Sequence, residues 1–179
     1  MTGAGRVYGE ALYSLAREER LEEALLEQLR VLQESFSQEP DFLRLLANRS
    51  IPAAERCAVL DKSFNGRIHS YVLNFLKILT ERGHILQFSD CYITYRDVYY
   101  AENGILPVRA VSAVALSQAQ SSRLTDKLER MTEKKILLTN DVDPATLGGM
   151  RLEYSGKELD DTVSHRLEEL RRLLANTVL

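Results

Sequence analysis

Residues 141–152 contain two aspartates and two glycines, and of all stretches in the chain this one most resembles a phosphate-binding turn. The stretch holds Asp143-Pro144 and the only Gly-Gly pair of the chain, Gly148-Gly149. Glycine-rich turns bind phosphates when backbone N–H groups can approach an anion closely. The sequence lacks both G-x-x-x-x-G-K-[ST] and G-x-G-x-x-G. We therefore interpret the stretch as a turn that enters a strand. An enzyme with an anion site near Gly148 is an alternative that titration with nucleotide or phosphate would test.

The other residues that often carry chemistry are scattered. His69, His84 and His165 fall in different predicted elements and share no metal-ligand spacing, so each is expected at the surface or rim. Cys57 and Cys91 form no C-x-x-C and lie in apolar helical patterns, which predicts buried free thiols. No G-x-S-x-G nucleophile motif is present.

Two acidic pairs remain, Asp141/Asp143 and Asp160-Asp161. Both lie where turns and helix caps favour a carboxylate. No set of residues forms a catalytic constellation, so the sequence predicts no enzyme, no cofactor and no metal. An interaction or structural protein is the better interpretation.

Composition agrees with a globular interaction protein. The 179 residues are 45% hydrophobic and 27% charged, enough for a packed core in one or two small domains. The net charge of -3 disfavours a nucleic-acid binder. No window approaches the roughly 18 apolar residues of a membrane span, and the N-terminal residues match neither a signal peptide nor a transit peptide.

Apolar residues recur at helical spacing from residue 5 to residue 101, which predicts a helical bundle. The expected helices are 5–18, 20–37, a short one opened by Pro40, 54–64 with Ser50 as N-cap, 68–81 and 85–101. The first and fifth are apolar on more than one side, which suggests burial or binding on both. The last carries Phe88, Tyr92, Tyr95 and Tyr99, a row that favours core packing with hydroxyls at the rim over a binding platform.

The pattern changes at Asn103-Gly104, and the remainder predicts a small β-α-β-β-α domain. The fold class is thus mainly α: an N-terminal six-helix bundle over residues 1–104 and a small α/β domain over residues 105–179. The predicted elements of the second domain are a strand 105–114, a helix from 116 to 131 capped by Ser117, strands 134–140 and 149–154, and a last helix capped at Asp160, Asp161 or Thr162 with Val163, Leu167, Leu170 and Leu174 inward.

Five short motifs, in order and at matching spacing, resemble the delta subunit of F-type ATP synthases, the family of the mitochondrial oligomycin-sensitivity-conferring protein. The resemblance covers nearly the whole chain, although Gly9 stands where the family usually has Ala. The motifs are Tyr8-Gly9-Glu10-Ala11-Leu12 with Ala16, Asn74-Phe75-Leu76 continuing to Arg82-Gly83, Val111-Ser112-Ala113-Val114-Ala115-Leu116-Ser117, the stretch from Val142-Asp143-Pro144 to Gly148-Gly149, and Asp160-Asp161-Thr162.

The resemblance implies a non-catalytic stator subunit that links the catalytic head to the peripheral stalk. The helical bundle would hold the N-terminal helix of an alpha subunit, and the C-terminal domain would bind the b subunits. The protein would be peripheral to the membrane, on the cytoplasmic side in a bacterium, and monomeric in isolation. An unrelated helical adaptor is the alternative; it would share the bundle but not the five ordered motifs.

A helix-in-groove contact suits a stator because an amphipathic partner helix can lay apolar anchors between two receiving helices. The double-faced first and fifth helices are the expected receivers. In this hypothesis Ala11 allows close approach, Ile78 offers apolar area, and Tyr8 and Asn74 add hydrogen bonds. The alternative is that these side chains only pack inside the bundle. The predicted groove residues are Tyr8, Ala11, Leu15, Tyr71, Asn74 and Ile78.

Overall fold

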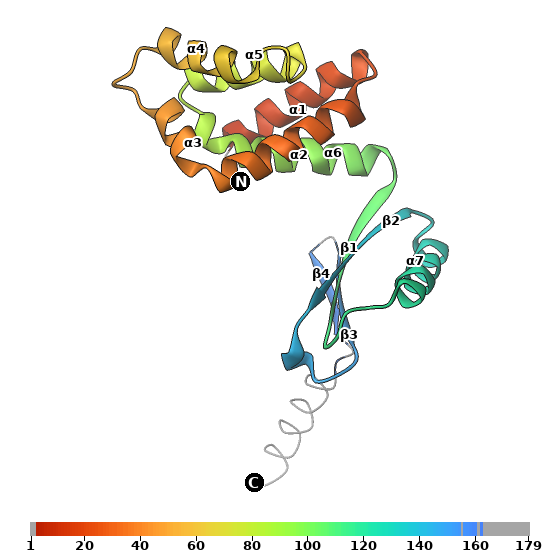
Figure 1. Cartoon of the computed structure of the whole chain (residues 1–179). Coiled ribbons are helices and arrows are strands. Elements are labelled where there is room, and N and C mark those ends of the chain that lie inside the picture. Colours follow the sequence, from red (N-terminus) through yellow and green to blue (C-terminus); the bar gives the residue numbers. More distant parts are fainter. Residues whose placement is uncertain (1–2, 155, 161, 163–179) are drawn as a thin grey trace, which may run out of the picture. The chain divides into compact units, whose positions relative to one another are not determined.

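The computed structural model describes residues 3–154, 156–160 and 162 of the chain (Figure 1). The chain divides into two compact units, one ending at Tyr99 and the other beginning at Tyr100. The described residues are mainly helical, and the second unit contains a small four-stranded sheet.

Six α-helices and a short 3-10 turn make up the described part of the first unit, and the last helix continues three residues past its boundary. They are α1 (Gly3–Glu18), α2 (Glu22–Gln38), α3 (Pro40–Ala47), α4 (Ala53–Phe64), α5 (Ser70–Glu81), the 3-10 turn Ile85–Gln87 and α6 (Phe88–Glu102). The predicted N-cap Ser50 is wrong, because Pro52 occupies the N-cap position of α4. The N–H of Ser50 instead donates to the side chain of Asn48, which turns the chain before the helix begins. The predicted helix 85–101 is also divided, since its first turn is 3-10.

The helices share one apolar core, to which each of α1–α6 contributes at least one buried side chain. Tyr95 of α6 is fully buried, and its hydroxyl donates to the carbonyl of Glu22 over 2.9 Å. Tyr92 and Tyr99 are half-buried against the same core. The prediction that this row packs in the core is therefore confirmed, with Tyr95 satisfying its hydroxyl inside the unit.

Gly9 lies where α1 approaches α6 closely. A Cβ at this position would lie 2.6 Å from the carbonyl oxygen of Cys91 and 2.8 Å from Cβ of Thr94, both in α6. Gly9, where the family usually has alanine, thus lies at a contact with α6 that leaves no room for a Cβ.

We expect Gly9→Ala to destabilise the first unit by about 1–2 kcal/mol, because forcing α1 away from α6 costs more than the helix propensity of alanine returns. Urea unfolding followed by far-UV circular dichroism measures the change. Gly3→Ala is the matched control, since no atom lies within 4 Å of a Cβ built there. A Gly9→Ala protein as stable as this control would show that the two helices separate freely.

Both cysteines are free and buried, as predicted. Burial raises the pKa of the Cys91 thiol from about 9 to about 12, and burial is also the main cause of the raised pKa of Cys57. Only a thiolate reacts readily, so both thiols are expected to be inert near neutral pH.

Two consequences can be measured on a Cys57→Ser protein. At pH 8, disulfide-exchange labelling of Cys91 should be about a thousandfold slower in the folded chain than in urea, because the thiolate fraction falls with the raised pKa. Cys91 should also contribute to stability below pH 9. That contribution is lost as the pH rises towards 12, because the unfolded thiol ionises before the folded one. Equal labelling rates in the two states would contradict both expectations.

The second unit is built around a sheet with strand order β2-β1-β3-β4 (Figure 1). Its elements are β1 (Ile105–Ser112), α7 (Gln118–Thr132), β2 (Lys135–Val142), a 3-10 turn (Pro144–Thr146), β3 (Met150–Tyr154) and β4 (Lys157–Asp160). β1 and β2 are parallel and joined through α7, whereas β3 is antiparallel to both β1 and β4. The predicted N-cap Ser117 is confirmed, because its side chain accepts from the N–H of Gln120 in a complete capping box.

The sequence prediction for this unit missed β4, a four-residue strand that pairs with β3. Strands this short carry little alternation to recognise. The predicted last helix, with Val163, Leu167, Leu170 and Leu174, lies outside the described residues, as does His165.

The connection between β2 and β3 is the stretch that first suggested phosphate chemistry. Asp143 holds it in place: its N–H donates to the carbonyl of Ser112 over 2.9 Å, and its carboxylate accepts from the N–H of Ala145 over 2.9 Å. Thr146 is buried, and its hydroxyl donates to the carbonyl of Asp143 over 2.8 Å. The stretch is a turn entering a strand, as predicted.

The turn connects two strands that do not pair, because β2 and β3 lie on opposite sides of β1. Gly149 has a φ of 79°, a left-handed conformation that glycine adopts without strain. It turns the chain into the first residue of β3.

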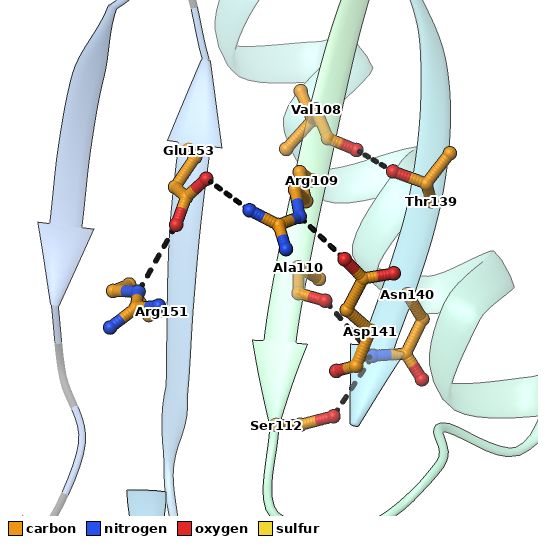
Figure 2. Close-up of polar contacts among 9 residues, drawn as sticks. All are labelled: Val108, Arg109, Ala110, Ser112, Thr139, Asn140, Asp141, Arg151 and Glu153. Carbon is orange, nitrogen blue, oxygen red and sulfur yellow. Dashed lines mark hydrogen bonds and ion pairs between the residues drawn. The ribbon is translucent and has the colours of Figure 1, made fainter. Parts of the chain in front are cut away.

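Side chains from β1, β2 and β3 fix the register of the sheet (Figure 2). Arg109 contacts two carboxylates, with 2.6 Å from Nε to Oδ2 of Asp141 and 3.0 Å from Nη1 to Oε2 of Glu153. Asn140 donates to the carbonyl of Ala110 over 3.0 Å and to the hydroxyl of Ser112 over 2.9 Å. A shift of β2 against β1 would break the three contacts with Asp141 and Asn140, and a shift of β3 would break the contact with Glu153, so together they favour one pairing.

Candidate partner-binding groove

A groove of about 490 Å³ runs between α1 and α5. All six residues predicted from the sequence line it, and the structure adds two more. The lining residues are Tyr8, Ala11, Leu12 and Leu15 from α1, and Tyr71, Asn74, Phe75 and Ile78 from α5.

Helical periodicity explains why these side chains share the groove. On each helix the lining residues recur at spacings of three or four, which places them on one face. Leu12 and Phe75 are buried, with 5% and 6% of their surface exposed. Leu15 and Ile78 keep 37% and 46% of theirs exposed. The groove therefore has a floor that belongs to the core and apolar walls that face solvent.

The alternative, that the predicted residues only pack inside the unit, does not hold for most of them. Ala11, Leu15, Asn74 and Ile78 are exposed. Tyr8 and Tyr71 are half-buried against the core cluster. Four of the six side chains thus offer free surface to a partner.

The groove residues predicted from the sequence do not include Leu12 and Phe75, which the structure places in the groove floor. Each directly follows a predicted lining residue, Ala11 or Asn74. A residue next to a groove position can point into both the core and the groove floor, since neighbours on a helix differ by only about 100°. This offset is the feature of the sequence from which Leu12 and Phe75 could be predicted as floor residues.

A different aromatic pair lies at each end of the groove. At one end the Tyr8 ring lies 5.8 Å from that of His84, which follows the C-terminus of α5. At the other end the ring of Tyr71 lies 5.0 Å from that of His69, the N-cap of α5, whose Nδ1 accepts from the N–H of Tyr71 over 3.3 Å. Because Tyr8 lies in the N-terminal half of α1, the two helices run in opposite directions along the groove.

Polar groups are few along the groove. Asn74, Tyr8 and Tyr71 carry its amide and hydroxyls. None of these three side-chain polar groups makes a hydrogen bond with another described residue. A surface of this kind can bury an amphipathic helix and accept a few directional contacts.

Across residues 3–154, 156–160 and 162, no helix combines the length and the apolarity that a bilayer crossing requires.

Comparisons with known proteins identify similar chains over nearly the full length. A model of the ATP synthase delta (OSCP) subunit family matches residues 4–174. ATP synthase subunit delta of Clostridioides difficile is 26% identical over 172 residues, covering 96% of this chain and 95% of that protein. ATP synthase subunit delta of Lactobacillus delbrueckii subsp. bulgaricus is 31% identical over 173 residues, covering 94% of each. A chain of the Toxoplasma gondii mitochondrial ATP synthase hexamer shares the fold, with a TM-score of 0.75, 18% identity and 98% coverage of both chains.

Proposed function

The chain belongs to the ATP synthase delta (OSCP) subunit family, and from that premise we propose that its α1–α5 groove holds the N-terminal helix of an alpha subunit. The protein is a peripheral-stalk component of an F-type ATP synthase and is not itself catalytic. It is peripheral to the membrane through the complex. The groove is the observation that supports the alpha-subunit assignment.

The physical task of a stator is to resist torque on the catalytic head. In this proposal the helices α1–α6 form a six-helix bundle, residues 1–104, that is the head-facing domain. The apolar walls at Leu15 and Ile78 lose their exposed surface when a helix is laid between them, and that burial supplies the binding free energy. The floor is already part of the core, so the receiving surface is preorganised.

The domain of residues 105–179 would contact the b subunits of the peripheral stalk. This assignment rests on the family resemblance and on the separation of the chain into two compact units. The protein would lie on the cytoplasmic face of a bacterial plasma membrane and be monomeric before assembly. An unrelated helical adaptor is disfavoured, because the family match extends over both units.

Isothermal titration of the full-length chain with a synthetic alpha-subunit N-terminal peptide tests the proposal directly. We expect saturable binding of one peptide per chain and a negative heat-capacity change, the signature of apolar burial. Co-purification of alpha, beta and b subunits with the tagged chain from native membranes tests the assembly independently. Absence of peptide binding by a chain that co-purifies with the complex would move the alpha contact away from the groove.

A further inference from the structure

Asn74 is the one polar residue at the middle of the groove. It lies one helical turn from Tyr71 and one turn from Ile78, and it is exposed. Its neighbours along the lining are apolar: Phe75 beside it on α5, and Ala11 and Leu15 on α1. The two tyrosines, by contrast, lie towards the ends, where a hydroxyl can keep a water molecule after a partner docks.

The Asn74 amide is not satisfied within the folded chain, since it makes no hydrogen bond with any described residue. In the free protein this exposed amide can hydrogen-bond to solvent water. A helix laid along the groove displaces that water at the centre of the contact. A wholly apolar partner face would leave the amide buried and unpaired, which disfavours binding.

Apart from Asn74, few features of the groove distinguish one position of a partner helix along it from another. The lining from Tyr71 to Ile78 is about 10 Å long, roughly two helical turns. Apolar wall residues repeat every three or four positions, so a helix shifted by one turn would meet nearly the same surface. A single buried polar pair is a known way to select one register among such alternatives.

We propose that Asn74 sets the register of the helix in the groove by pairing with one amide or hydroxyl side chain at the centre of that helix's apolar face. The occupant is an amphipathic helix with apolar residues one turn before and one turn after this polar residue. This inference rests on the proposed function, because it specifies the chemistry of the helix that the groove receives.

Two peptides of identical composition test the register. The first is the alpha-subunit N-terminal peptide. In the second, the polar residue at the centre of the apolar face is exchanged with the apolar residue one turn away. We expect the full-length chain to bind the first about ten- to a hundredfold more tightly than the second. The Asn74→Leu chain should lose this preference to within about threefold, while Gln38→Leu, an exposed change at the end of α2, should keep it.

The outcomes separate the two proposals. If the unaltered chain binds neither peptide, the proposed function fails and this inference fails with it. If it binds both equally, or if Asn74→Leu retains the full preference, the groove holds a helix but Asn74 does not set its register. Circular dichroism of each variant confirms that the exposed substitution leaves the helices intact.

Discussion

Replacing Ala11 by aspartate is expected to weaken binding of an alpha-subunit N-terminal peptide by at least about a hundredfold, because docking would bury an unpaired carboxylate among apolar side chains. Ala11 lines the groove between Tyr8 and Leu15 on α1 and is exposed in the free chain. The new carboxylate therefore remains in water until a partner arrives. The helical circular dichroism signal and the unfolding midpoint should stay unchanged.

Ser14→Asp is the matched control. Ser14 lies one turn along the same helix, is exposed and does not line the groove. It introduces the same charge, so any long-range electrostatic effect on a charged peptide appears in both variants and can be subtracted. Calorimetric titration of the unaltered, Ala11→Asp and Ser14→Asp chains with the peptide measures the three affinities. An Ala11→Asp chain that binds as tightly as the Ser14→Asp chain would remove Ala11 from the interface and contradict the groove assignment.

The groove could be predicted because each of its walls is a single helix. Residues three and four apart on one helix share a face, so spacing alone indicates that α1 and α5 are each apolar on more than one side. That property, together with the family resemblance, makes them the expected receivers of a partner helix. That their faces meet is a tertiary fact beyond the reach of spacing. The floor residues Leu12 and Phe75 were missed because periodicity assigns each residue to one face, whereas a residue at a groove floor serves two.

The sheet was less predictable than the helices. β1 and β3 were placed close to their true bounds, because their β-branched or alternating residues are local signals. The strand order could not be predicted, because no local pattern near Gly149 indicates that β1 lies between β2 and β3. The contacts of Arg109 with Asp141 and Glu153 join residues 32 and 44 positions apart, beyond the reach of any local pattern.

Arg56 is the most consequential residue that the sequence interpretation passed over. It lies in α4, one turn before Leu60, so it occupies a core position in a row of apolar residues. Only 5% of its surface is exposed, and within the described part of the chain its guanidinium forms no ion pair with a carboxylate. A single arginine within an apolar helical row was the available signal, because a buried cation must find acceptors elsewhere.

Those acceptors are backbone carbonyls, two in the last turns of helices and one in the connection before α4. Nη1 of Arg56 donates to the carbonyl of Leu46 over 2.6 Å and to that of Thr80 over 3.0 Å, and Nε donates to the carbonyl of Ile51 over 3.1 Å. Leu46 and Thr80 lie in the last turns of α3 and α5, where carbonyls lack the usual partner four residues on and the dipole favours a cation. The carbonyl of Thr80 also accepts from the N–H of Gly83 over 3.2 Å. One side chain thus joins three helices of the first unit.

Replacing Arg56 by methionine, which keeps much of the aliphatic volume, is therefore expected to cost about 3–4 kcal/mol of unfolding free energy, because buried carbonyls lose their donors. Urea unfolding monitored by circular dichroism measures the loss. Arg56→Lys keeps the charge but cannot reach three carbonyls at once, so about half of the loss should return. Peptide affinity of the folded fraction should not change, since Arg56 does not line the groove. If methionine is tolerated without loss, packing at this position outweighs hydrogen bonding, and the helix ends are satisfied without the guanidinium.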